Sequence, residues 1–131
     1  MTHEYSLRVY YQDTDAGGVV YHANYLAFAE RARTEALRAQ GAAHMELLAE
    51  HGVLFVVRRI NLRYQRPARL DDVIRIQTAF RAIGGASVAL QQAFWRGGDS
   101  LAVLDMNLAC VRAEDGKAAR IPEAWAMKLK R

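Results

Sequence analysis

Two hydrophobic periods follow one another along the first half of the chain. Over residues 5–12 apolar and polar side chains alternate, which predicts a strand. Over residues 24–40 apolar residues recur every three or four positions, which predicts a long amphipathic helix that ends at Gly41. A shorter helix is predicted over residues 43–50, with Gly52 just beyond its end. The chain therefore opens with one strand and one principal helix.

From residue 53 onward the period is two, and it stays so for most of the remaining chain. This alternation predicts four strands, and the glycine pairs at 84–85 and 97–98 are typical of hairpin turns. We expect the four strands to follow one another in an antiparallel meander, and we expect no firm structure over residues 118–131. The predicted class is α+β, with an antiparallel sheet of about five strands wrapped around one long helix, plus a short second helix.

Length and composition are those of one globular domain spanning residues 1–131. The chain is 52% hydrophobic and 24% charged, and it has no apolar run long enough to span a membrane. Its first residues lack the basic and apolar regions of a signal peptide, and the lone Cys110 excludes an internal disulfide. The cytoplasm is therefore the expected compartment.

The charge balance is basic, with a formal net charge of +4. The arginines are spread along the chain rather than clustered, which is typical of a solvated surface and also fits a polyphosphorylated ligand such as coenzyme A. Nucleic acid is not an expected partner, because no basic cluster interleaved with aromatic residues is present.

The densest group of reactive side chains lies in residues 13–25, which read DTDAGGVVYHANY. This stretch holds two carboxylates, a glycine pair and an imidazole immediately before the long helix. A helix start presents unpaired N–H groups and a positive dipole end, which favour developing negative charge. Asp15 is the candidate base or nucleophile of an acyl-transfer site, although an aspartate before glycines also caps turns.

Two other chemistries are disfavoured by the same residues. The spacing of Asp13 and Asp15 resembles the start of a calcium loop, but Gly17 and Asn24 stand where further ligands are needed, so no metal is predicted. The segment around Ser87 lacks the second glycine of a nucleophile elbow, so an α/β-hydrolase mechanism is not expected.

The run of residues 10–25, continuing through 30–35, resembles the hot-dog-fold acyl-CoA thioesterases. The similar subgroup is that of 4-hydroxybenzoyl-CoA thioesterase and the Tol-Pal-associated thioesterases. Residues 55–59 and 64–72 are similar to a second block of the family, so the resemblance covers nearly the whole chain. It implies a homodimer or homotetramer in which sheets pair edge to edge and active sites lie between subunits.

Carried over by position, the resemblance places the catalytic carboxylate on Asp15 and the oxyanion donor on the backbone N–H of His22. The His22 side chain is typical of the Tol-Pal-associated branch, which favours an aliphatic or broad acyl range. The imidazole has three open roles: orienting Asp15, binding the thioester carbonyl, or fixing the loop. The expected reaction is hydrolysis of acyl-CoA without a cofactor, with Asp15 acting as nucleophile or as general base.

The remaining candidates support this site. Asp13, Gly17, Gly18 and Tyr25 are expected to shape the loop and the oxyanion site, and Phe28 is expected to line or support the acyl pocket. Arg81 is a candidate contact for the coenzyme A phosphates, with an exposed strand arginine as the equal alternative.

Two other functions compete with acyl-CoA hydrolysis. One is a non-catalytic protein that binds acyl-CoA or acyl carrier protein, or serves as a scaffold. The other is a dehydratase acting on acyl carrier protein, which needs a histidine–acid pair that this loop does not present. Acyl carrier protein also stays open as the carrier of a hydrolysed substrate.

Overall fold

The computed structural model describes residues 2–130. In chain order the elements are β1 (Thr2–Arg8), a short 3-10 turn η1 (Tyr11–Asp13), α1 (Asn24–Ala39), α2 (His44–His51), β2 (Val53–Tyr64), β3 (Val73–Ile83), β4 (Ser87–Arg96), β5 (Asp99–Arg112) and α3 (Glu123–Lys130). The predicted α+β class and the positions of both predicted helices are confirmed. Among the described residues no helix is both long enough and apolar enough to cross a membrane.

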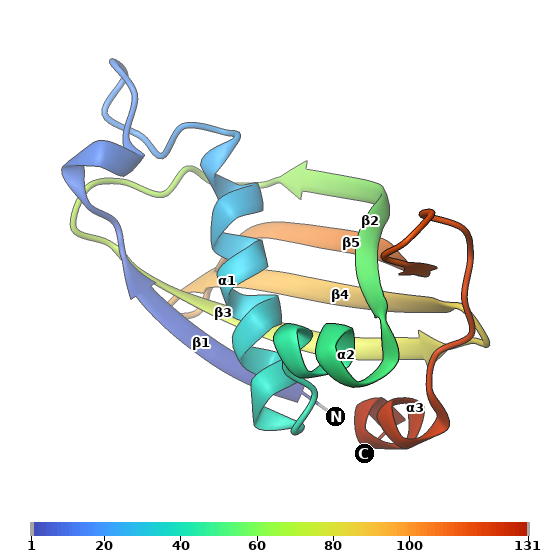
Figure 1. Ribbon diagram of the computed structural model, residues 1–131. Coiled ribbons are helices and arrows are strands. Elements are labelled where there is room, and N and C mark those ends of the chain that lie inside the picture. The colour runs from blue at the N-terminus through green and yellow to red at the C-terminus, as the bar shows by residue number, and fades with distance from the viewer. Residues whose placement is uncertain (1, 131) are drawn as a thin grey trace.

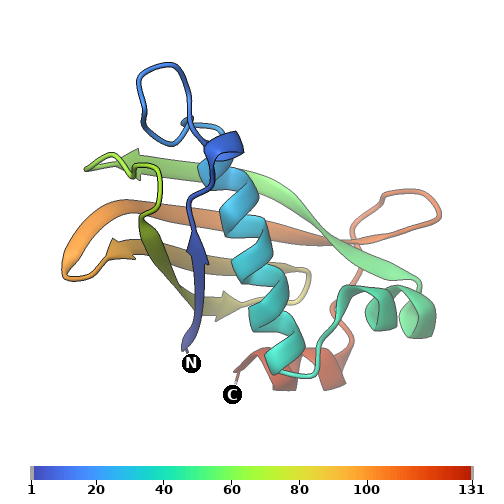
Figure 2. The ribbon, with the colours of Figure 1, turned by 90° about the vertical axis from the view of Figure 1, so that its left-hand side faces the viewer.

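One antiparallel sheet carries the fold, with α1 lying across one of its faces (Figures 1 and 2). The strand order is β1-β3-β4-β5-β2, and every neighbouring pair is antiparallel. The first two strands along the chain, β1 and β2, thus lie at opposite edges of the sheet. The loop between β1 and α1 lies at the same end of the molecule as the C-terminal end of β2 (Figure 1).

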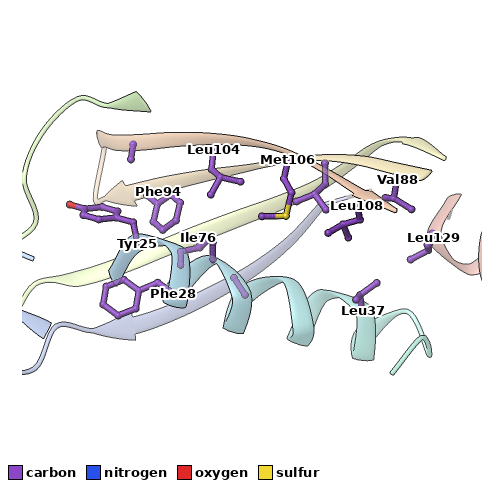
Figure 3. Close-up of a cluster of buried hydrophobic side chains, with 14 of the residues drawn as sticks. Tyr25, Phe28, Leu37, Ile76, Val88, Phe94, Leu104, Met106, Leu108 and Leu129 are labelled. Carbon is purple, nitrogen blue, oxygen red and sulfur yellow. The ribbon is translucent and has the colours of Figure 1, made fainter. Parts of the chain in front are cut away.

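The core fills the space between α1 and the sheet (Figure 3). Because α1 is apolar over a broad face, it buries Tyr25, Phe28 and Leu37 against inward-facing strand residues such as Ile76 and Phe94. One buried polar group ties the two layers together. The Nε2 of Gln92 donates to the carbonyl oxygen of Ala29 at 2.8 Å and to the hydroxyl of Thr78 at 3.0 Å.

The expected four-strand meander is wrong at its first member. β2 does not pair with β3; it pairs with β5 at the far edge, from Val53 opposite Arg112 to Tyr64 opposite Ala102. Only β3, β4 and β5 form a meander. Alternation specifies which face of a strand is buried, but it carries no information about which strand lies beside it.

Two boundaries also differ from expectation. β1 ends at Arg8, and the chain then turns through η1, so the alternation over residues 5–12 extends beyond the strand. The tail is not irregular, because α3 packs Trp125 and Leu129 into the core.

Glu30 and Arg33, three positions apart on α1, suggest an exposed ion pair, but Arg33 is only 8% exposed. It lies on the buried face of α1, and its Nη1 donates to the Sδ of Met106 at 3.3 Å. Burial lowers the pKa of Arg33, and the negative charge of Glu30 opposes that shift. The apolar face of α1 is wide enough to include this position, which the charge pattern alone concealed.

Candidate functional site

The loop that carries Asp15 is a tight turn built by its own backbone. Thr14 bridges Val20, the N–H of Asp15 donates to the carbonyl of Val19 at 2.9 Å, and the N–H of Gly18 donates to the carbonyl of Asp15 at 3.0 Å. The Asp15 side chain is exposed, and its Oδ1 accepts the N–H of Gly17 at 2.8 Å. The turn therefore holds the carboxylate in a defined direction while leaving it open to solvent.

Glycine is favoured at positions 17 and 18 of this turn for two different reasons. Gly18 adopts φ = +79°, a left-handed conformation that side chains disfavour. Gly17 has no such angle, but a Cβ placed on it would lie 3.2 Å from Oδ1 of Asp15. A side chain at position 17 would therefore crowd the carboxylate of Asp15, and glycine leaves that space open.

Asp13 uses both its side chain and its backbone to fix the loop onto the helix. Its Oδ2 accepts the N–H of Tyr10 at 2.8 Å. Its carbonyl oxygen accepts the N–H of Tyr21 at 3.0 Å and the side-chain Nδ2 of Asn24 at 2.8 Å. Asp13 thereby connects η1, the loop and the first residue of α1.

The backbone immediately before α1 presents unused donors. The N–H of Asn24 donates back to the carbonyl of Tyr21 at 2.8 Å, which closes the first turn. Within residues 2–130, the N–H groups of His22 and Ala23 have no hydrogen-bond acceptor. They lie at the positive end of the α1 dipole, where an oxyanion would be stabilised.

A pocket of about 250 Å³ opens beside these donors. Its walls are Val20, His22 and Tyr25 from the loop and helix, and Tyr64, Gln65, Arg66 and Pro67 from the end of β2 and the segment after it. We call it the aromatic pocket. Tyr25 is only 2% exposed, and its ring packs against Phe94 and Tyr64 at centroid distances of 5.5 and 5.2 Å.

The structure brings some predicted residues together and separates others. His22 and Tyr25 line the aromatic pocket, whereas Asp15 and Gly18 line a second hollow of about 480 Å³. Phe28 is 1% exposed and packs beneath Tyr25, so within this chain it supports the pocket rather than lining it. Each hollow takes part of its wall from the loop of residues 14–20, but from different residues of it.

Within residues 2–130, the His22 imidazole and the Arg81 side chain form no hydrogen bond with Asp15 or with each other. The imidazole is exposed and packs against the ring of Tyr21, with centroids 4.5 Å apart. Arg81 lies near the opposite end of β3, where its Nη2 donates to Oε1 of Gln91 at 2.8 Å on the sheet face away from α1. Its role toward coenzyme A stays a prediction.

Sequence reasoning missed the wall contributed by residues 64–72. A carboxylate–guanidinium pair braces that wall: Oδ2 of Asp72 accepts Nη1 of Arg96 at 2.9 Å and the N–H of Arg69 at 2.8 Å. Burial raises the pKa of Asp72, but the Arg69 N–H and the Arg96 guanidinium outweigh it and lower the pKa overall. The sequence did place residues 64–72 in a block similar to the thioesterase family, but that block was assigned no part in the site.

A family model described as the Thioesterase-like superfamily matches residues 9–129. The chain belongs to this superfamily. The resemblance drawn from residues 10–25 is thereby confirmed, together with the hot-dog fold that it implied. The match includes the Asp15 turn, the start of α1 and the wall of the aromatic pocket.

Other members of the thioesterase-like superfamily are similar over most of their length. An acyl-CoA thioester hydrolase YbgC of Escherichia coli O6:H1 is 42% identical over 95% of this chain and 92% of its own. An acyl-CoA thioesterase YbgC of Haemophilus influenzae is 40% identical over 91% and 88%. A solved structure of a probable thioesterase from Bartonella henselae superposes with a TM-score of 0.86 at 36% identity, covering 93% of this chain and 100% of that one.

Proposed function

We propose that this protein is an acyl-CoA thioesterase that releases a carboxylic acid and free coenzyme A. The observation that carries the proposal is that one loop before α1 holds both an oriented, solvent-open carboxylate on Asp15 and unpaired amides at the α1 start. The similarity to curated acyl-CoA thioester hydrolases at 40–42% identity supports the same reaction.

The chemistry follows from these groups. Asp15 either attacks the thioester carbon, giving a mixed anhydride that water then hydrolyses, or removes a proton from an attacking water. In both routes a C–O bond forms at the thioester carbon, and negative charge develops on the carbonyl oxygen. The N–H of His22 donates a hydrogen bond to that oxygen. The C–S bond then breaks, and the sulfur leaves as the thiol after taking a proton.

The functional unit in this proposal is at least a homodimer. Asp15 and His22 line separate hollows within one chain, so a second copy is needed to enclose a substrate between them. β2 is an edge strand whose Val56, Val57 and Ile60 are exposed, which gives this edge an apolar surface for pairing. A dimer or tetramer built on that edge places each site at a subunit boundary.

An acyl group of aliphatic or broad type is the substrate class we propose, and we expect it to bind in the aromatic pocket. Its walls combine the rings of Tyr25 and Tyr64 with the apolar side chains of Val20 and Pro67. Acyl carrier protein is the alternative carrier for the same thioester, and the cytoplasm stays the predicted compartment.

The decisive experiment measures free-thiol release from short, long and aromatic acyl-CoAs by the wild type and by Asp15→Asn. We expect the substitution to lower kcat by at least about 10³-fold, because it removes the only group assigned to attack or base catalysis. Glu114→Gln is the matched control, since it removes an exposed turn carboxylate far along the chain. It should retain wild-type turnover.

The other outcomes identify the alternatives. Binding of acyl-CoA by the wild type without thiol release would replace the hydrolase with a binding or scaffold protein. Release from acyl carrier protein but from no acyl-CoA would change the carrier. Full activity in Asp15→Asn would exclude Asp15 as the catalytic carboxylate.

A further inference from the structure

Two tyrosines at the aromatic pocket each bind the backbone of the other's segment. Tyr25, on α1, accepts the N–H of Ala68 on its Oη at 3.2 Å. Tyr64, the last residue of β2, donates its hydroxyl to the carbonyl oxygen of His22 at 2.7 Å. The two rings meet edge to face, with an interplanar angle of 88°. We call this reciprocal pair the tyrosine clasp.

The Tyr64 hydrogen bond fixes the orientation of a peptide plane at the candidate oxyanion site. In a trans peptide the C=O and N–H groups point in opposite directions. Because the His22 carbonyl points to Tyr64, the N–H of Ala23 in the same peptide points away from Tyr64. The preceding peptide is fixed separately, since the Tyr21 carbonyl accepts the N–H of Asn24 and so directs the His22 N–H away from the helix.

Only one of these two planes depends on a side chain. The Tyr21–His22 peptide is held by the first turn of α1. The His22–Ala23 peptide is held at its oxygen by Tyr64, and in the described part of the chain no backbone donor reaches that oxygen. Without the Tyr64 hydroxyl, this plane loses the hydrogen bond at its oxygen, and only the backbone of the Tyr21–Asn24 turn restrains it.

We propose that Tyr64 is a positioning residue for thioester hydrolysis. Its hydroxyl acts through the His22 carbonyl to hold the Ala23 amide, beside the separately held His22 amide, in the direction that a developing oxyanion requires. This inference rests on the proposed function, and it assigns Tyr64 no contact with the reacting atoms. Oxyanion donors act through fixed orientation, so a small rotation reduces their effect in the transition state more than it changes substrate binding.

Tyr64→Phe is the direct test, because it keeps the ring and its contact with Tyr25 while removing only the hydroxyl. We expect kcat to fall about tenfold, less than the 10²–10³-fold typical of deleting an oxyanion donor, since both donors remain and only the Ala23 amide loses alignment. KM should stay within about twofold. Tyr5→Phe is the matched control, because it removes the hydroxyl of a partly buried tyrosine on β1, and it should leave both constants unchanged.

Three kinetic results would overturn the proposal. They are an unchanged kcat in Tyr64→Phe, a rise in KM alone, and an equal fall of kcat in Tyr5→Phe. The second would make Tyr64 a pocket wall and nothing more. Failure of the proposed function would look different, because the wild type itself would then release no thiol.

A spectroscopic measurement tests the same contact without activity. The carbonyl ¹³C resonance of His22 reports the hydrogen bond to its oxygen and should move upfield in Tyr64→Phe, together with a change at the Ala23 amide. The amides of Gly84 and Gly85, in the β3–β4 hairpin, serve as the internal reference and should not move. Unchanged His22 and Ala23 resonances would overturn the proposal even if the variant lost activity through instability.

Discussion

At the scale of single residues, Gly17 and Gly18 illustrate what a motif conceals. The sequence presents them as one pair that is expected to shape the loop. The structure separates them into one glycine required by its left-handed backbone and one required by the Asp15 carboxylate beside it. No spacing rule distinguishes these causes, because the second depends on where a side chain two residues earlier turns.

His44 is a residue whose ionisation opposes folding. It begins α2, and its Nε2 is buried with no hydrogen-bond partner in residues 2–130. Burial lowers its pKa, and the positive charges of Arg33 and Arg38 lower it further, while Glu30 opposes them. Below a pH of about 6.5 the unfolded chain therefore binds a proton that the folded chain resists, so stability decreases as the pH falls.

His44→Gln should remove this part of the pH dependence. We expect the urea midpoint of the wild type to fall more between pH 7 and pH 5 than that of the variant. His51→Gln, at the exposed end of the same helix, is the control and should keep the wild-type dependence. Parallel curves for the wild type and His44→Gln would contradict the assignment.

At the scale of elements, hairpins were predictable and long-range pairing was not. The glycine pairs at 84–85 and 97–98 do separate β3, β4 and β5. The position of β2 was not encoded locally, since its neighbour β5 follows it by two intervening strands. α3 was missed although Pro122 precedes it, Glu123 begins it and Lys128 lies in its last turn, all of which are helix-terminus signals.

The segment after β2 depends on the Asp72–Arg96 pair for its shape. Arg96 also donates to the carbonyl of Pro67 at 3.2 Å, so one guanidinium connects β4 to two points of the pocket wall. Arg96→Met should lower the free energy of unfolding by about 1–2 kcal/mol, since it removes charge-assisted hydrogen bonds from a partly buried carboxylate. Urea denaturation at pH 7 measures this loss.

Arg112→Met is the matched control. It breaks a 2.8 Å pair with Asp115 in an exposed turn, where solvent screens the charges, so the expected loss is smaller than that of Arg96→Met. Equal losses in the two variants would show that Arg96 does not brace the wall.

Because the pKa of Asp72 is lowered on folding, its contribution is present at neutral pH and is lost as the pH falls below about 3.9.

At the scale of the whole molecule, the sequence indicated the candidate residues of the loop but not the pocket wall that faces them. Residues 13–25 indicated the carboxylate and the amides because these lie close together along the chain. The aromatic pocket needed Tyr64 and Pro67, which only the folded chain brings to His22. If a second copy supplies part of the wall, the spacing of residues within one chain does not indicate which residues those are.

The proposed dimer has a direct test at the β2 edge. Ile60→Lys places a charge on an apolar strand residue that is 38% exposed, so it should shift the protein from dimer to monomer in light scattering and lower thiol release with it. Val73→Lys is the control, because Val73 is 44% exposed but lies at the start of β3. A wild-type mass for Ile60→Lys would reject this edge as the interface.

The two edges of the sheet differ in a way that affects polymerisation. β2 is twelve residues long and carries exposed apolar side chains, whereas β1 has seven residues and presents charged ones such as Glu4, which is paired with Arg75. Pairing of β2 with the β2 of another copy is self-complementary, so the apolar β2 edges of both copies are buried in the same interface. Such an assembly closes after two chains, and the short, charged β1 edges that remain outside are poor templates for fibre growth.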